Sequence, residues 1–331
     1  MIASVAFRNF KALRNASVRL EPFNLVLGPN GSGKTSLIEA LLHLRALAVL
    51  APTDARPGAA TDRGPDFVFQ FTPPHDALQV RLSCQEASRC NALHVTPADA
   101  AGWPALRQEI LRLRSYVFDH DAMAEPAARQ DSLELRPDGA NLAPVLAALR
   151  EQAPGAFAMF TSEALRLFPE YTRLELLAKG TDRVALGFHL LGEVGLVEGE
   201  NLSQGTLHTL GVLALSLLPA PPSVLCIEEI DRGVHPRMLR EIRDAFYRLS
   251  YPSSFGLDRP AVQVIATTHS PYLLDLFREH PEEIILTQKH GREAHFERLS
   301  DRADLAHILQ EGSLGDLWFS GILGGVPEER I

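Results

Sequence analysis

Residues 28–35 read Gly-Pro-Asn-Gly-Ser-Gly-Lys-Thr, a full match to the phosphate-binding pattern G-x-x-x-x-G-K-[ST]. The glycines let backbone N–H groups wrap a phosphate, and Lys34 brings a positive charge to the β- and γ-phosphate oxygens. The hydroxyl of Thr35 is an oxygen ligand of the kind that Mg²⁺ accepts. The motif therefore predicts that the chain binds a nucleoside triphosphate with Mg²⁺. The residues expected to contact the nucleotide are Asn30, Gly31, Ser32, Gly33, Lys34, Thr35 and Ser36.

Two adjacent carboxylates, Glu228 and Glu229, follow the short apolar run 223–227. This run predicts a central parallel strand, and ligands of open α/β sheets bind at the carboxyl ends of such strands. Glu228 is predicted to hold Mg²⁺, while Glu229 orients or deprotonates the water that attacks the γ-phosphate. An exposed acidic turn would also supply two carboxylates, but it does not account for the apolar strand before them.

The motif Leu202-Ser203-Gln204-Gly205 precedes an apolar helical pattern over 206–218. A helix N-terminus offers free N–H groups, and the Ser203 hydroxyl adds a donor, so the motif suits a second anion. A serine here is also a favoured helix cap. The place of the motif, between the phosphate loop and the paired carboxylates, favours the anion site, with Ser203, Gln204 and Gly205 as its contacts.

Two more polar residues end strand-like apolar runs. His269 follows the run 262–267 and is suited to donate a hydrogen bond to the γ-phosphate and to sense its loss. Gln70 lies near the end of the run 67–71 and is a further candidate ligand of Mg²⁺. A solvent-facing glutamine on a strand is the commoner case, so both interpretations of Gln70 stay open.

The elements around these motifs predict an α/β fold. The phosphate-binding motif lies between an apolar strand at 23–27 and helical spacing at 36–42, which is the order that it needs. Residues 52–65 are expected to form an exposed loop. Other strand patterns occupy 2–7, 16–20, 77–82, 173–178, 184–190 and 195–198. Helical patterns at 105–114, 141–152 and 156–168 predict an inserted helical lobe.

The composition is that of an ordinary globular protein: 331 residues, 46% of them hydrophobic. The N-terminus lacks a leader pattern and no apolar run reaches the length of a membrane span, so we expect a cytoplasmic protein without a membrane partner. The three cysteines predict neither a zinc site nor a disulfide framework. A net charge of −9 opposes non-specific binding to DNA, although a local basic groove, for example with Arg107, Arg112 and Arg114, would permit it.

In their order along the chain, the phosphate loop, L-S-x-G, the paired acids and Thr-His-Ser-Pro at 268–271 resemble the heads of ABC ATPases. Within that class they resemble the branch that contains the structural-maintenance-of-chromosomes (SMC) proteins, RecF and the OLD-type phage-exclusion ATPases. Residues 5–11 look like the opening strand of this branch with its Asn-Phe-basic turn, and 228–231 resembles its D-E-x-D. Segments 138–146 and 315–321 look like parts of its small stand-alone bacterial members.

The resemblance implies a P-loop ABC-ATPase head with a mixed sheet core and an inserted helical lobe, and slow hydrolysis of ATP with Mg²⁺. It also implies a homodimer that sandwiches ATP, in which Ser203 and Gly205 contact the γ-phosphate of the ATP bound by the opposite subunit. His269 would be the switch histidine, and Gln70 the glutamine that reaches the metal and the attacking water. Asp231 would begin the loop, to His235, that crosses the dimer interface.

Two departures from the branch stand out. Glu228 replaces the usual Asp, which adds a methylene before the metal, and residues 232–236 lack the acidic-Asn run of many relatives. The sequence has neither a zinc-hook C-x-x-C nor a long coiled coil, and the roughly sixty residues after His269 are too few for the nuclease domain of OLD-type proteins. The resemblance therefore implies a separate effector protein, such as a nuclease, in bacterial anti-phage defence.

These features predict a single ATPase head over 1–331, with lobe I formed by 1–90 and 215–331 and a helical lobe at 91–214. Two other functions stay open. One is a RecF- or SMC-like repair ATPase that clamps DNA, and the other is a scaffold held together by ATP with little turnover. A transporter ATPase is less favoured, because the Asn-Phe-basic turn and Glu-Glu-Ile-Asp point elsewhere.

Overall fold

The structure is a computed structural model that describes residues 1–53, 64–87, 89–98, 100–192, 195–291 and 293–324. The chain divides into two compact units. Unit 1 is formed by Met1–Ser115, Pro222–Glu228 and Asp258–Ile331, and unit 2 by Tyr116–Pro221 and Glu229–Leu257. One of the boundaries between the units therefore falls between the two carboxylates Glu228 and Glu229. Most of the expected loop 52–65 lies outside the described residues.

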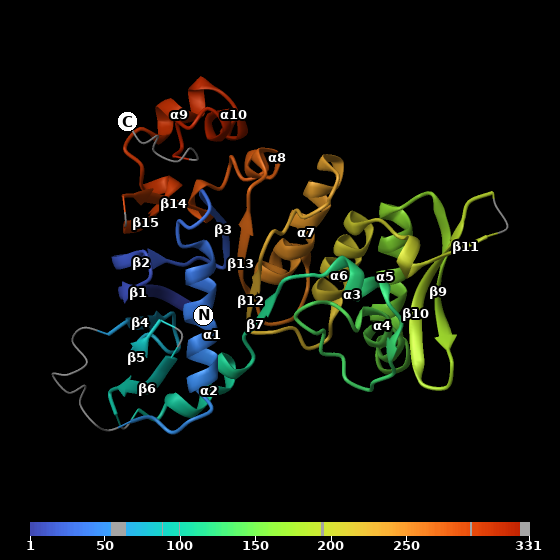
Figure 1. The fold of residues 1–331 in the computed structure, drawn as a ribbon, viewed down its shortest axis with the longest axis horizontal. Coiled ribbons are helices and arrows are strands. Elements are labelled where there is room, and N and C mark those ends of the chain that lie inside the picture. The colour runs from blue at the N-terminus through green and yellow to red at the C-terminus, as the bar shows by residue number, and fades with distance from the viewer. Residues whose placement is uncertain (54–63, 88, 99, 193–194, 292, 325–331) are drawn as a thin grey trace. The chain divides into compact units, whose positions relative to one another are not determined.

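A six-stranded sheet in unit 1 has the order β15-β14-β3-β13-β12-β7 (Figure 1). The neighbours β14, β3, β13 and β12 are parallel, and β15 is antiparallel to β14. β3, β12 and β13 are buried along their whole length, which is why they are mostly apolar in sequence. The strands are β3 (Phe23–Leu27), β7 (Arg114–Tyr116), β12 (Val224–Ile227), β13 (Gln263–Thr268), β14 (Ile284–His290) and β15 (Glu293–Arg298).

The register of this sheet brings three strand ends together. Leu27 at the end of β3 lies opposite Thr268 at the end of β13. Ile227 at the end of β12 lies opposite Ala266. Because these strands are parallel, the segments that follow them, which begin at Gly28, Glu228 and His269, leave the sheet at the same edge.

A second, antiparallel sheet of unit 1 has the order β2-β1-β4-β5-β6. Its core side carries aromatic residues, with the rings of Phe10 and Phe67 4.7 Å apart. Leu41 and Leu44 of helix α1 belong to a core cluster that includes residues of both sheets, so α1 is held by packing along its length. The elements are β1 (Ile2–Phe10), β2 (Leu13–Arg19), α1 (Lys34–Leu47), β4 (Asp66–Phe71), β5 (Gln79–Glu86), β6 (Arg89–Thr96) and α2 (Trp103–Leu111).

Three short helices complete unit 1: α8 (Pro271–Asp275), α9 (Leu305–Glu311) and α10 (Leu314–Phe319). α10 packs on α8 at very short range, because a Cβ at Gly315 would lie 2.6 Å from the carbonyl oxygen of Pro271. The N–H of Gly315 also donates to Asp275 Oδ1 at 2.9 Å. These contacts give a structural reason for Gly315, the first residue of the segment 315–321.

Unit 2 is built around the buried helix α6 (Gln204–Leu217), whose residues from Thr206 to Ser216 are all buried. Helices α3, α4, α5 and α7 pack against it. In its sheet β10 pairs with β8, β9 and β11. The other elements are α3 (His120–Ala124), β8 (Ala127–Ala128), α4 (Leu142–Gln152), α5 (Pro154–Leu167), β9 (Tyr171–Lys179), β10 (Arg183–Leu190), β11 (Leu196–Glu198) and α7 (Leu239–Ser250).

The two units divide the chain differently from the lobes expected at 1–90 with 215–331 and at 91–214. Helix α2 belongs to unit 1, where Arg107 on it donates to the carbonyl oxygens of Ala48 and Val49, at 2.6 and 3.0 Å, beyond the end of α1. Residues 229–257 belong to unit 2, where α7 packs on α6 and Arg166 of α5 binds Glu241 of α7 at 2.6 Å. The chain thus returns to the helical unit after β12, which an apolar pattern along the sequence does not reveal.

The cysteines differ from the sequence-based expectation. Cys84 on β5 and Cys90 on β6 lie opposite each other and form a disulfide. The spacing of the two residues did not predict it, because the pairing depends on the hairpin that joins these strands. Cys226 is a buried free thiol inside β12, and burial raises its pKa. No helix in the described part of the chain has both the length and the apolar character to cross a membrane.

Candidate functional site

The phosphate-binding motif forms the loop between β3 and α1. Gly31 and Gly33 have φ angles of 73° and 108°, which side chains of other residues rarely adopt. Gly28 is required for a different reason, since a Cβ there would lie 1.8 Å from Thr287 Oγ1 and 2.7 Å from Ser32 Oγ. The sequence thus folds here into a tight turn that leads directly into the N-terminus of α1, and a helix N-terminus after such a turn is a typical anion-binding site.

Lys34 lies inside this loop and is only 9% exposed. Its Nζ donates to the carbonyl oxygen of Gly28 at 2.6 Å and to that of Pro29 at 3.1 Å. The ammonium group is therefore held at the centre of the loop by backbone acceptors, and a phosphate that enters the loop meets a positive charge already in place.

Thr287 is a support of the phosphate loop that the sequence did not suggest. It lies on β14, and its hydroxyl donates to the carbonyl oxygen of Leu27 at 3.0 Å and also contacts Ser32 Oγ. These contacts bridge the end of β3 and the phosphate loop. A single threonine in a strand far along the chain carries no sequence signal for such a role.

Thr35 and Glu228 are brought together, as a shared metal site requires. Thr35 Oγ1 donates to Glu228 Oε2 at 3.0 Å. A hydroxyl and a carboxylate oxygen at this separation, beside a phosphate site, form the hard-oxygen donor set that Mg²⁺ prefers. The described residues contain no group of three or more His, Cys, Asp or Glu side chains arranged to hold a metal. One hydroxyl and one carboxylate fit an ion whose remaining ligands would come from phosphate and water.

His269 and Gln70 lie in different surroundings. His269 is exposed and directly follows Thr268, whose partner in the sheet is the last residue before the phosphate loop. Gln70 on β4 accepts a hydrogen bond from Ser4 Oγ at 3.0 Å. Ser4 lies two residues from Ile2 on β1, and Ile2 bonds to Gln263, the first residue of β13. The other end of β13 leads to His269, about 20 Å away along the strand. Gln70 therefore lies toward the end of β13 that is far from His269. The structure does not bring Gln70 to the phosphate loop.

Ser203, in unit 2, caps helix α6. Its Oγ accepts from the backbone N–H of Thr206 at 3.1 Å. The residue itself is exposed, and Gln204 and Gly205 are partly exposed. The hydroxyl thus occupies the N-terminus of a 14-residue helix, where it can cap the helix and still meet an anion from outside.

Glu229 begins a segment of unit 2, residues 229–234, that faces the Leu202-Ser203-Gln204-Gly205 motif and is called the Glu229 segment below. Its φ angle of 51° is unusual for a residue with a side chain, and such backbone strain costs on the order of 1–3 kcal/mol. The N–H of Arg232 donates to the carbonyl oxygen of Glu229 at 2.9 Å, and Arg232 Nε lies 3.6 Å from Glu229 Oε2. The Glu229 carboxylate is about half exposed, at 54% for the side chain, and is open to a reactant from solvent.

His208 lies beneath this segment and was missed by the sequence reasoning. It is 3% exposed, and its Nε2 lies 2.8 Å from the carbonyl oxygen of Ile230. A carbonyl only accepts, so Nε2 carries the hydrogen. Burial lowers the pKa of His208 to about 4, with Arg232 adding to the shift and the bond to Ile230 opposing it, so the ring is neutral at pH 7. A lone His in an apolar helix gives no sequence sign of this contact.

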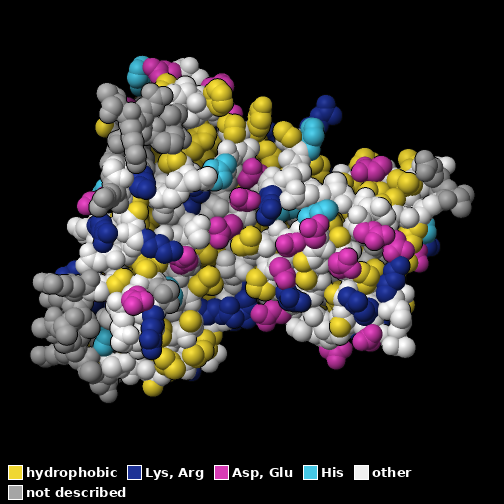
Figure 2. All heavy atoms as spheres, in the orientation of Figure 1, with side chains coloured by type: hydrophobic (Ala, Val, Ile, Leu, Met, Phe, Trp, Pro, Cys, Tyr) yellow, Lys and Arg dark blue, Asp and Glu magenta, His cyan; other side chains and the backbone are white. Residues whose placement is uncertain are grey.

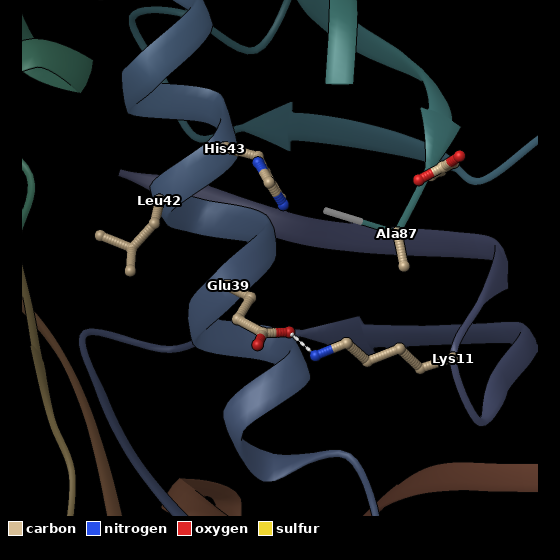
Figure 3. A pocket seen from close by; sticks show the side chains of 6 residues that line it. Lys11, Glu39, Leu42, His43 and Ala87 are labelled. Carbon is tan, nitrogen blue, oxygen red and sulfur yellow. Dashed lines mark hydrogen bonds and ion pairs between the residues drawn. The ribbon is translucent and has the colours of Figure 1, made fainter. Parts of the chain in front are cut away.

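The basic residues Arg107, Arg114 and Lys11 have structural partners within unit 1. Arg114 donates from Nη1 to the carbonyl oxygens of Leu111 and Leu113, and Arg107 binds beyond the end of α1, as described above. Lys11, in the Asn-Phe-basic turn, binds Glu39 at the rim of a hollow of about 480 Å³ beside α1 (Figure 3). This pair is exposed, and such pairs contribute roughly 0–1 kcal/mol to stability.

Comparison with known proteins places this geometry in a class. The chain is similar to a solved SMC head bound to the C-winged helix domain of ScpA, with a TM-score of 0.61, 13% identity, and coverage of 89% of this chain and 97% of that one. It is also similar to an SMC head domain with an extended coiled coil derived from Pyrococcus furiosus, bound to the C-terminal domain of ScpA. That match has a TM-score of 0.57 and 13% identity, and it covers 94% of this chain and 99% of that one. The match to the SMC head domain from Thermotoga maritima has a TM-score of 0.51 and 13% identity, and it covers 90% of this chain and 98% of that one.

The fold is therefore the mixed α/β fold of SMC head P-loop ATPase domains, which confirms the predicted fold class. Residues 23–275 match the family model described as "AAA domain, putative AbiEii toxin, Type IV TA system", and the chain belongs to this family. No match to a curated protein was found. A nucleotide-binding ATPase fold is thus established, and such folds usually bind nucleotide with Mg²⁺.

Proposed function

We propose that the chain is a switch that binds ATP with Mg²⁺, closes head to head with a second copy, and opens again after slow hydrolysis. The observation that carries this proposal is the common edge of the six-stranded sheet, where the phosphate loop, Glu228 and His269 follow neighbouring parallel strands. The contact of Thr35 with Glu228 supports it further, because these two side chains form the expected half of a Mg²⁺ site.

Each residue of this edge has a task in the proposal. Residues 30–36 bind the phosphates through their N–H groups, and Lys34 turns from the carbonyl oxygens of the loop to the β- and γ-phosphates. Thr35 and Glu228 hold Mg²⁺, which when bound neutralises charge on the phosphate oxygens. Glu229 orients the attacking water and accepts its proton, and His269 donates to the γ-phosphate. We give Gln70 no role, because of its place in β4.

In the proposed dimer, the second subunit supplies the other half of each ATP site. Ser203, Gln204 and Gly205 of one subunit would meet the γ-phosphate on the other, and Asp231 would begin the loop that reaches across. The support is the exposed Ser203 at the N-terminus of α6, since a helix N-terminus attracts an anion. Closure would then depend on the γ-phosphate, and its loss would release the dimer.

The test is Glu229→Gln, which keeps the shape of the side chain but removes the base. The variant should bind ATP, hydrolyse it at least about 100-fold more slowly, and accumulate as a dimer with Mg-ATP in light scattering. Lys34→Ala is the matched control and should remain a monomer. If both Glu229→Gln and the wild-type protein stay monomeric in saturating Mg-ATP, the dimer switch is refuted. A persistent ATP dimer with no wild-type turnover would instead identify an ATP-held scaffold.

The partner controlled by the switch is proposed to be a separate effector, such as a nuclease, in anti-phage defence. The support is the family description, which names a toxin of a type IV toxin–antitoxin system, together with the resemblance to phage-exclusion ATPases. Co-expression with the product of the neighbouring gene tests it. The proposal requires a complex that forms or dissociates with ATP and that fails to respond in Lys34→Ala.

DNA clamping is the remaining alternative. On the face shown in Figure 2, Asp and Glu side chains gather over the helices of unit 2, with Lys and Arg side chains among them, and the net charge of −9 opposes the approach of phosphates. Tight binding of duplex DNA that depends steeply on salt would favour the clamp over the effector switch.

A further inference from the structure

We propose that His208 is a positioning residue that joins helix α6 to the segment that carries Glu229, so that the two move as one piece. The inference rests on the proposed ATPase function and adds to it a residue that touches neither nucleotide nor water. It is drawn from three contacts inside unit 2.

The first contact is the hydrogen bond from His208 to Ile230. Ile230 is fully buried and follows Glu229, so its carbonyl oxygen belongs to the peptide group between Ile230 and Asp231, one residue beyond the strained residue. A φ of 51° at Glu229 persists only if its surroundings hold it there. The 2.8 Å bond from a buried, neutral ring supplies such a restraint from α6.

The second contact is the close approach of Gly205 and Gly233. A Cβ at Gly205 would lie 2.2 Å from the carbonyl oxygen of Gly233, and a Cβ at Gly233 would lie 2.9 Å from Cγ of Gln204. The two backbones therefore touch directly at the start of α6. Together with the bond from His208, which is one helical turn further along, this fixes the Glu229 segment to α6 at two places.

The third contact fixes the imidazole itself. The ring of Phe118 meets His208 edge to face, with centroids 5.4 Å apart. The His208 ring is thus packed as well as hydrogen-bonded, and its Nε2 has little freedom to turn away from Ile230. A restraint of this kind transmits a small displacement of the helix instead of absorbing it.

The consequence concerns communication between two ATP sites. In the proposed dimer Ser203 engages the partner's ATP, whereas Glu229 acts on the ATP of its own subunit. A link from α6 to Glu229 therefore lets engagement at one site position the base at the other. A side chain that only filled the core would contribute to stability without affecting this step.

The test compares two substitutions that differ in reach. His208→Gln places its amide nitrogen near the position of Nε2 and can still donate to Ile230, whereas the amide of His208→Asn is one methylene shorter and cannot. We expect His208→Asn to lower kcat by at least about tenfold with an ATP Kd within about twofold of wild type, because a misplaced base affects the chemical step alone. His208→Gln should stay within about threefold of wild-type kcat.

Ser216→Ala is the matched control, since Ser216 is a buried polar residue of the same helix whose hydroxyl bonds locally to Leu213 at 2.8 Å. It should reduce stability without lowering kcat of the folded protein. The role of His208 is refuted if His208→Asn keeps the kcat of Ser216→Ala, or if ATP affinity falls as much as kcat. If His208→Asn does not fold, a tenfold loss of kcat in folded His208→Gln also refutes it. A wild-type turnover that Lys34→Ala leaves unchanged would refute the ATPase proposal instead.

Discussion

Gly205→Ala should break the contact between the Leu202-Ser203-Gln204-Gly205 motif and the Glu229 segment. The new Cβ would lie 2.2 Å from the carbonyl oxygen of Gly233 and 2.9 Å from its carbonyl carbon. Close C···O contacts in proteins are about 3.3 Å, so the two backbones must separate by roughly 1 Å. Both colliding groups are main chain, and no flexible side chain can move aside to relieve the clash.

The expected magnitude follows from this displacement. Overpacking of this kind costs about 1–3 kcal/mol, which should appear in the free energy of unfolding measured with urea in the absence of nucleotide. A displacement of 1 Å at a catalytic group costs about 100-fold in rate, so kcat for ATP should fall by one to two orders of magnitude.

Gly155→Ala is the matched control for Gly205→Ala. Gly155 lies in helix α5 of the same unit, and a Cβ there has no atom within 4 Å. It should leave kcat unchanged and leave stability equal or higher by up to about 1 kcal/mol, as expected for Gly to Ala in a helix. If Gly205→Ala matches Gly155→Ala in both unfolding free energy and kcat, the reasoning from the close approach is wrong.

Three further predictions address other parts of the molecule. Lys34→Ala should lose ATP binding measured by calorimetry, since it removes the charge at the centre of the phosphate loop; unchanged affinity would contradict the assignment of this loop. The pKa of His208 is about 4 in the folded protein and ordinarily 6.5, so between these pH values the unfolded chain binds a proton that the folded protein does not. The contribution of the neutral ring to the free energy of unfolding is therefore complete above pH 6.5 and is lost as the pH falls towards 4. The difference in unfolding free energy between wild type and His208→Gln should therefore change by about 3 kcal/mol across this window, and a constant difference would count against a buried neutral ring. Affinity for duplex DNA at physiological salt, if measurable, should increase with ATP, and equal affinity with and without ATP would argue against a groove formed by closure.

The local parts of the site could be predicted from the sequence because each is encoded by adjacent residues. The phosphate loop needs its glycines and Lys34 in a fixed order, and the apolar runs before Glu228 and His269 identify buried parallel strands. The structure gives these runs neighbouring places in one sheet. The contact of Thr35 with Glu228 follows from that arrangement.

Other parts depend on contacts between residues far apart in the chain. Thr287 supports the phosphate loop from a strand about 250 residues later, and His208 reaches Ile230 only because α6 packs beneath the Glu229 segment. The disulfide between Cys84 and Cys90 depends on a hairpin register. For Gln70 the sequence left two interpretations open, and its hydrogen bond from Ser4 Oγ on the neighbouring strand favours the structural one.

Complementation between two inactive variants tests the central claim most directly. In the proposed dimer each ATP touches Lys34 of one subunit and Ser203 of the other, so Lys34→Ala and Ser203→Arg each inactivate both sites of a homodimer. A mixed dimer collects both lesions around one ATP and leaves the other site intact. ATP turnover should therefore reappear on mixing, up to about half of the wild-type rate per mixed dimer if the sites act independently and less if they are coupled. Folded variants that form confirmed mixed dimers without any recovered turnover would contradict an ATP site shared between two subunits.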